Sequence, residues 1–136
     1  MSKTLLKSLA ATVLALAFTT GAFAQEWRLA AEIPFNFIVG DMKMPSGHYT
    51  VQIHAGNSLL IRSTENYKAV VSFANVMTTP RNLKSGRLVF NAYGDRYYLS
   101  TVSWPEGPSR MVPPTKAELQ IAKEHAVQPR LEVATQ

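Results

Sequence analysis

Cysteine is absent from the 136 residues of the chain. This absence excludes disulfide bonds, thiolate metal sites and a lipidated N-terminal cysteine. Because no covalent crosslink is available, the hydrophobic core alone must hold the fold together. The histidines do not have the spacing of metal ligands, since His48 and His54 would lie about 20 Å apart on one strand at about 3.3 Å per residue. We therefore expect neither a metal nor a cofactor.

Catalytic motifs are missing as well. The chain has no Gly-x-Ser-x-Gly nucleophile motif and no glycine-rich phosphate loop. A pair of catalytic carboxylates would need facing positions on a sheet, and of the acidic residues only Glu32 lies on a predicted strand. The sequence therefore predicts no catalytic residues and no enzyme. An enzyme of unrecognised type remains the alternative.

Long apolar runs are confined to the start of the chain. Lysines precede an apolar stretch over residues 8–20, and Ala22-Phe23-Ala24 places small residues at both positions that signal peptidase reads. The stretch is shorter than the roughly 20 residues that span a bilayer. Residues 1–24 are therefore predicted to be a signal peptide, with an uncleaved anchor helix as the alternative. After cleavage near Ala24 we expect a periplasmic or extracellular protein without a transmembrane segment.

Acidic residues are fewer than basic ones, nine against fourteen, and the formal net charge is +5. Lys3 and Lys7 belong to the predicted signal peptide, so the remaining chain carries twelve basic residues against the same nine acidic ones. This small excess does not indicate nucleic-acid binding, and we expect no nucleic-acid partner.

What the chain does contain is an apolar side chain at every second position over several short runs. The runs cover residues 27–39, 48–54, 58–63, 68–76, 87–93 and 96–104. They predict a mainly β fold, a six-stranded antiparallel meander that closes as a small barrel or sandwich, because an open sheet would leave its apolar face in water. The expected core includes Phe35, Phe37, Val51, Phe73 and Phe90.

The end of the chain has a different pattern. Residues 105–114 contain four prolines and are predicted to be irregular. Thr115 and Glu118 fit a capping box, which predicts one short helix over residues 115–126. Residues 25–126 should thus form a single β domain with a C-terminal helix, and residues 127–136 a disordered tail.

Aromatic side chains gather on the predicted hairpin over residues 87–104. Tyr97 and Tyr98 point to opposite faces of one strand, so at least one of them should be exposed. Exposed Tyr and Trp can stack on sugar rings or receive the apolar groups of a partner protein, although cross-strand packing is an alternative use. The predicted binding surface consists of Tyr93, Tyr97, Tyr98 and Trp104, with an envelope polysaccharide or another envelope protein as partner. A basic loop with Arg81, Lys84 and Arg87 is a second candidate, for an anionic polymer or lipid headgroups.

Four segments occur in a characteristic order: Phe37-Ile-Val-Gly40, Met44-Pro-Ser-Gly-His-Tyr-Thr-Val51, Leu59-Leu-Ile-Arg62 and Gly86-Arg-Leu-Val-Phe-Asn-Ala-Tyr-Gly-Asp-Arg-Tyr-Tyr-Leu-Ser100. Together they resemble a family of small exported bacterial proteins of unknown function. Its members carry a signal peptide, a Pro-x-Gly-x-Tyr turn, a Leu-Val-Phe strand with a Tyr-Gly-Asp-Arg-Tyr hairpin, and a short C-terminal helix. The resemblance covers most of residues 33–126 and implies an exported β domain without an assigned activity.

From the sequence we therefore expect an exported, non-enzymatic β domain that acts as a binding or structural module of the cell envelope. A barrel that carries a small apolar ligand is a further alternative. The alternatives differ in the interior they require, because a carrier needs a hollow core and an enzyme needs a polar cleft.

Overall fold

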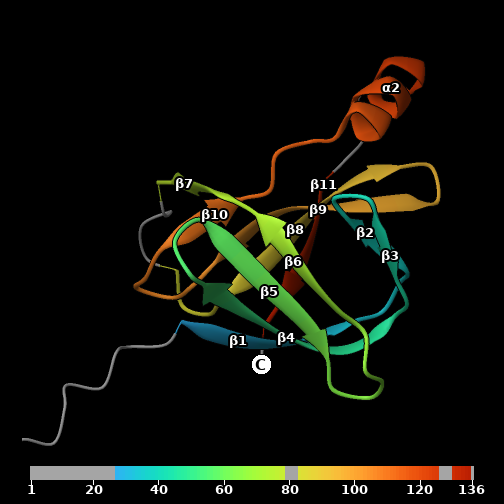
Figure 1. Ribbon diagram of the computed structural model, residues 1–136. Coiled ribbons are helices and arrows are strands. Elements are labelled where there is room, and N and C mark those ends of the chain that lie inside the picture. The colour runs from blue at the N-terminus through green and yellow to red at the C-terminus, as the bar shows by residue number, and fades with distance from the viewer. Residues whose placement is uncertain (1–26, 79–82, 126–129, 136) are drawn as a thin grey trace, which may run out of the picture.

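The computed structural model describes residues 27–78, 83–125 and 130–135. The predicted signal peptide, residues 1–24, lies outside these ranges. The predicted fold class is confirmed, because the described residues form a mainly β structure with one short helix, α2 (Lys116–Glu124; Figure 1). Within these ranges no helix is both long and apolar enough to cross a membrane.

The strands form two sheets. The first has the antiparallel order β1-β4-β5-β6, in which the strands are β1 (Arg28–Ile33), β4 (Gly47–His54), β5 (Ser58–Ser63) and β6 (Ala69–Phe73). The second has the order β11-β8-β9-β10-β7, in which the strands are β11 (Arg130–Ala134), β8 (Arg87–Tyr93), β9 (Arg96–Ser103), β10 (Ser109–Met111) and β7 (Asn75–Met77). A hairpin of β2 (Phe37–Val39) and β3 (Met42–Met44) joins the second sheet through a parallel pairing of Ile38 with Tyr98.

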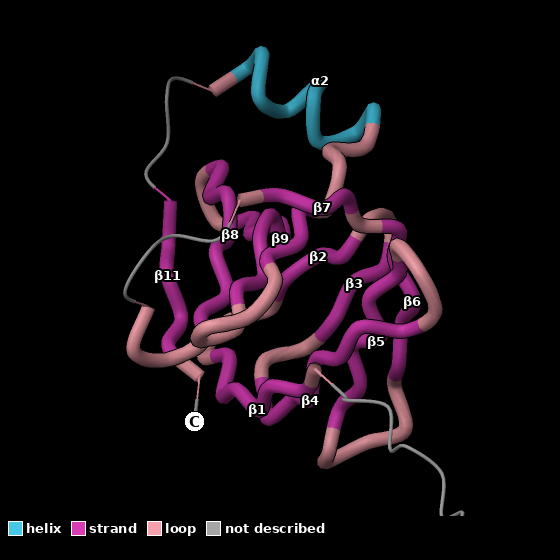
Figure 2. Tube along the Cα trace, turned by 90° about the vertical axis from the view of Figure 1, so that its left-hand side faces the viewer, coloured by secondary structure: helices cyan, strands magenta, loops and turns pink. Residues whose placement is uncertain are grey.

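The chain passes from one sheet to the other at three corners. Pro34 begins the corner between β1 and β2, Pro45 begins the corner between β3 and β4, and Ala74 separates β6 from β7. Proline cannot donate to a strand ladder, which explains why the predicted run over residues 27–39 divides. The sheets therefore curl around a common interior (Figure 2), as expected of a small barrel or sandwich. The described residues form eleven strands in place of the predicted six-stranded meander, because the corners divide two of the predicted runs and because β3, β10 and β11 form outside the predicted runs.

Aromatic side chains from both sheets fill the interior. Phe37 is 2% exposed and its ring meets those of Tyr49 and Phe90 edge to face, with centroids 5.0 and 5.6 Å apart. Edge-to-face contacts of this kind add to the free energy gained by burying the rings. Phe35 is partly buried beside Phe90, at a centroid distance of 5.0 Å. Of the predicted core residues, Phe37, Val51 and Phe90 are buried.

Phe73 is a correction, because its side chain is 58% exposed. In β6 the half-buried residues are Val70 and Ser72, so the apolar residues Val71 and Phe73 face outward. The sequence-based prediction placed Phe73 on the buried face of this strand, whereas the structure places it on the exposed face. Because valines occupy both Val70 and Val71, periodicity alone does not distinguish the two faces.

The outer strands of the two sheets are arranged differently on the two sides of the molecule. On one side β1 and β11, the outer strands of the two sheets, lie beside each other (Figure 1). On the other side the sheets end at β6 and β7, which are consecutive in the chain. Residues 69–77 contain no charged residue, and they expose Val71, Phe73, Val76 and Met77.

Two predictions about the last part of the chain are corrected. Ser109–Met111, within the proline-rich segment, forms β10 between β9 and β7. Arg130–Ala134, within the predicted disordered tail, forms β11 and pairs with β8. Leu131 and Val133 alternate with exposed residues and pack against the core, so a two-residue period was present in a segment too short to stand out.

Candidate binding site

The predicted aromatic surface does not form as a unit. Trp104 is 2% exposed and belongs to the hydrophobic core, and Tyr98 is 5% exposed. Tyr93 and Tyr97 are half-buried and lie on opposite faces of the β8–β9 hairpin. Two of the four residues are therefore not available to stack on a ligand, and the other two cannot share one surface.

A β-bulge changes which side chains of β9 face the core. Phe90 pairs with Leu99, but Val89 pairs with Thr101, so Ser100 has no partner on β8. One extra residue reverses the facing of the side chains beyond it. As a result Leu99 and Val102 both enter the core, although they lie three positions apart.

The outer face of the hairpin is occupied by the chain's own helix, α2. Tyr93 contacts Tyr98 edge to face at 5.8 Å between centroids, and the His125 ring at the helix end lies 6.4 Å from Tyr93. Glu118 of α2 is only 6% exposed, and the Asn91 side chain of β8 hydrogen-bonds to it. Burial raises the pKa of the Glu118 carboxyl, and the bond to Asn91 opposes part of that increase.

The start of this helix agrees with the predicted cap. The hydroxyl of Thr115 accepts a hydrogen bond from the backbone N–H of Glu118, at 3.2 Å. α2 spans Lys116–Glu124 and His125 follows as its C-cap, so the predicted helix is confirmed up to this point. Ala126, the last residue of the prediction, lies outside the described residues.

Tyr97 lines a candidate site that was not predicted from the sequence. A groove of about 510 Å³, called here the hairpin groove, lies between the β2–β3 hairpin and the β8–β9 hairpin. Its walls contain Phe37, Ile38, Met44, Pro45, Tyr97 and Tyr98, and its polar residues are Asn36, Lys43, Lys68, Asp95 and Arg96. The volume falls within the range of about 300–1,000 Å³ that is typical of ligand sites.

Sheet pairing brings these walls together. Gly40, at a φ of +61°, lets the chain turn tightly between β2 and β3. The parallel pairing of Ile38 with Tyr98 then fixes this hairpin against β9. The ring of Tyr97 lies 4.3 Å from that of Phe35, between centroids, which limits its movement. The apolar part of the groove is therefore built on regular structure.

Lys68 reaches the groove from the turn between β5 and β6. Its backbone N–H donates to the Asn66 side-chain oxygen at 2.8 Å, and its Nζ donates to the backbone carbonyl of Lys43 at 3.1 Å. The backbone N–H groups of Glu65 and Asn66 donate to the hydroxyl of Ser63, at 3.2 and 3.1 Å. The turn thus has an internal set of hydrogen bonds that places Lys68 beside Lys43.

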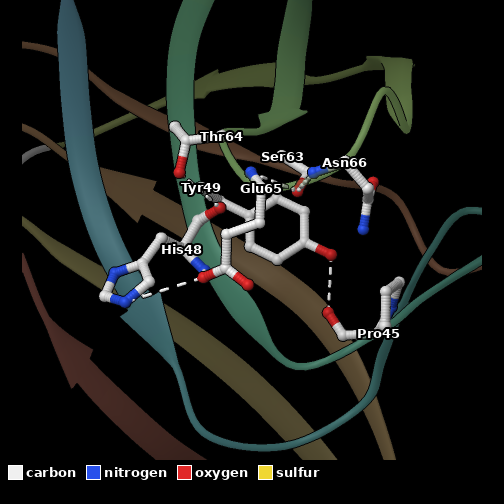
Figure 3. Close-up of polar contacts among 7 residues, drawn as sticks. All are labelled: Pro45, His48, Tyr49, Ser63, Thr64, Glu65 and Asn66. Atoms are coloured by element: carbon white, nitrogen blue, oxygen red, sulfur yellow. Dashed lines mark hydrogen bonds and ion pairs between the residues drawn. The ribbon is translucent and has the colours of Figure 1, made fainter.

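Glu65 ties this turn to the first sheet (Figure 3). Its Oε1 accepts a hydrogen bond from the backbone N–H of His48 at 3.0 Å and lies 3.6 Å from His48 Nε2. A Cβ at Gly47 would lie 3.3 Å from Glu65 Oε2, so glycine leaves the space that the carboxylate needs. Below it, the Tyr49 hydroxyl donates to the carbonyl of Pro45, a wall residue of the groove. We call this set of contacts the Glu65 clamp.

The groove is positively charged. It has three basic side chains, Lys43, Lys68 and Arg96, against one carboxylate, Asp95. Among residues 27–78, 83–125 and 130–135 no acidic side chain forms an ion pair with any of the three basic groups. The Asn36 side-chain oxygen accepts from the backbone N–H of Ser46 at 2.9 Å, so its NH₂ group remains able to donate.

The predicted basic loop is only partly described, because Arg81 lies outside the described residues. Lys84 and Arg87 line a second hollow of about 330 Å³ with Glu132 of β11. Arg87 Nη1 lies 3.5 Å from Glu132 Oε1, so part of the positive charge of the loop is neutralised within the protein. This hollow is therefore less suited to an anion than the hairpin groove.

No cluster of three or more His, Asp or Glu side chains that could hold a metal ion occurs in the described part of the chain. Comparisons of the chain with protein-family models, curated proteins and solved structures gave no match.

Proposed function

We propose that this protein is an exported, non-enzymatic binding module of the cell envelope, and that the hairpin groove is its binding site. The proposal of export rests on the lysines, apolar stretch and Ala22-Phe23-Ala24 of the first 24 residues. The proposal of binding rests on one observation above the others. Three basic side chains without an acidic ion-pair partner in the described chain surround an apolar groove large enough for a ligand.

The polar contacts around the groove support this proposal. The Glu65 clamp, the Lys68 bond to the Lys43 carbonyl and the Asn36 contact to Ser46 place donors before any ligand arrives. Groups that are already ordered lose less conformational entropy on binding.

The interior argues against the alternative of a carrier that encloses an apolar ligand. Such a carrier needs a hollow core, whereas Phe37, Tyr49 and Phe90 meet ring to ring between the sheets. The hairpin groove lies at the surface and has charged residues among its walls.

Retention on isolated envelope material tests the proposal. We expect the exported protein to bind this material and the double variant Lys43→Ser/Arg96→Ser to lose most of the binding while keeping its melting temperature. Lys84→Ser is the matched control, because Lys84 lies in the second hollow, and it should bind like the wild type. Equal retention of all three proteins would show that the groove is not the site.

A further inference from the structure

We propose that the hairpin groove recognises an acidic sugar unit of a polysaccharide. The inference rests on the proposed function, because it names the ligand of the same groove. The carboxylate of the sugar would meet Lys43, Lys68 and Arg96, its hydroxyl groups would meet Asp95 and Asn36, and its apolar ring face would lie against Tyr97. Each assignment follows from what the side chain can donate, accept or cover.

The three basic residues favour an anionic ligand. Lys43 comes from β3, Lys68 from the β5–β6 turn and Arg96 from β9, yet all three line one groove. Lys68 Nζ uses one of its three N–H groups on the Lys43 carbonyl, which leaves two for a ligand. Charge-assisted hydrogen bonds from lysine and arginine to a carboxylate are stronger than neutral ones.

Asp95 narrows the class of anion. The Asp95 carboxylate repels any anion, but it accepts hydrogen bonds from hydroxyl groups, so an anion that also carries hydroxyl groups offsets the repulsion better than a simple anion does. Asn36 adds a donor, because its oxygen is already bound to the Ser46 N–H. A ligand that needs cations, an acceptor and an amide donor within one site carries hydroxyl groups as well as a negative charge. Uronic-acid sugars have this combination.

The aromatic wall fits the same ligand. Tyr97 is half-buried, and its contact with Phe35 at 4.3 Å limits the positions of its ring. Sugar rings have apolar C–H faces that pack against tyrosine. Ile38, Met44 and Pro45 extend the apolar wall beside it. The groove is also open to solvent, as a site for one unit of a long polymer must be.

Calorimetric titration of the exported protein with defined probes tests the inference. The probes are oligogalacturonate, oligomannuronate, methyl-esterified oligogalacturonate, inorganic phosphate and phosphatidylglycerol vesicles. We expect binding to at least one acidic oligosaccharide, at least tenfold weaker binding to the ester, and weaker binding at higher salt. Lys43→Ser/Arg96→Ser should weaken binding to the acidic probe at least tenfold, and Lys84→Ser less than twofold.

Asp95→Ala separates this inference from a general attraction of anions. If Asp95 accepts a sugar hydroxyl, removing it weakens binding of the acidic oligosaccharide even though the groove becomes more positive. If the groove attracts anions only by charge, the same variant binds more tightly, and the inference is overturned. Tighter binding of phosphate or vesicles than of both acidic oligosaccharides would overturn it as well.

The two proposals can fail separately. Groove-dependent retention on envelope material without binding to either acidic oligosaccharide would refute the acidic sugar and leave the binding module intact. Retention that does not depend on Lys43 and Arg96 would refute the groove as the envelope site. Acidic oligosaccharide binding could then still be measured at the groove by titration.

Discussion

At the scale of single residues, aromatic side chains have opposite roles according to the strand face on which they lie. Phe37 is buried where the sheets meet, between Tyr49 and Phe90, whereas Phe73 lies on the outside of an outer strand. Tyr97 lies between these extremes, with its ring held by Phe35 and one side lining the groove. Aromatic residues therefore occur in the core, on the outer surface and in the hairpin groove.

Phe37→Ala should lower the free energy of unfolding by about 3–5 kcal/mol, because the substitution leaves a cavity among the core rings. Phe73→Ala is the matched control and should change it by no more than about 0.5 kcal/mol, because the ring is already mostly in water. Denaturant unfolding measures both values. A loss below about 1 kcal/mol for Phe37→Ala would mean that the strand presents its other face to the core.

Glu118 should make stability depend on pH. Burial raises the pKa of its carboxyl above the ordinary value of 4.5, so the folded protein holds this proton more tightly than the unfolded chain does. The contribution of Glu118 to stability is therefore greatest below 4.5 and falls as the pH rises through the folded-state pKa.

Glu118→Gln tests this expectation. The variant should remove that part of the pH dependence and raise the melting temperature at neutral pH, because no charge is then buried under α2. Melting temperatures across the acidic to neutral range give the measurement, and Glu124→Gln, on the exposed part of the same helix, is the control. Parallel pH curves for the wild type and Glu118→Gln would contradict the assignment.

At the scale of elements, Glu65 connects a turn to a binding site that Glu65 itself does not line. Glu65 holds the β5–β6 turn against β4 through the His48 N–H, and that turn carries Lys68 into the groove. A contact outside the groove thus determines where one of its three basic groups lies.

Glu65→Ala should cost about 0.5–1.5 kcal/mol of stability, the usual value of one hydrogen bond. It should also speed amide exchange at residues 64–68 and weaken ligand binding. Asp41→Ala, at the exposed β2–β3 turn, is a control for the loss of one surface carboxylate. Unchanged exchange at residues 64–68 would show that other contacts fix the turn.

The elements that have a strong local sequence signal were predicted from the sequence. The runs over residues 87–93 and 96–104 predicted the β8–β9 hairpin, Thr115 predicted the start of α2, and the run over residues 58–63 matches β5. Elements of three residues, β3 and β10, are too short to show a period. The bulge at Ser100 reverses which side chains of β9 face the core beyond that point, and no nearby residue gives a sequence signal for it.

The candidate site was predicted only through its aromatic residues. Tyr97 and Tyr98 line the groove, but Asn36, Lys43 and Lys68 lie far from them along the sequence. They meet because the chain changes sheets at Pro34 and Pro45 and because β2 pairs in parallel with β9. Such long-range pairings have no local sequence signal, so the basic residues looked like ordinary surface lysines.

At the scale of the whole molecule, β11, the last described strand, completes the second sheet. β11 pairs with β8 over five residues, places Leu131 and Val133 against the core and lies beside β1. Without it, β8 would become a sheet edge and the buried side chains Leu88 and Phe90 would lose neighbours.

Deletion of residues 130–136 should therefore lower the free energy of unfolding by at least about 2 kcal/mol, because two packed apolar side chains and a strand ladder are lost. Deletion of Gln136 alone is the control and should have no measurable effect. Denaturant unfolding of the two truncated proteins gives the comparison. Equal stability would mean that β11 contributes nothing to the fold.

The position of β11 also sets the order in which the molecule can be assembled. When the N-terminal part of the chain becomes available first, β1, β4, β5 and β6 can pair early, because these strands are near neighbours in sequence. The second sheet cannot be completed until residues 130–134 are available to β8, and contacts across such sequence distances form slowly. Under the proposal that the chain is exported as an unfolded polypeptide, the second sheet becomes complete only after residues 130–134 have been released.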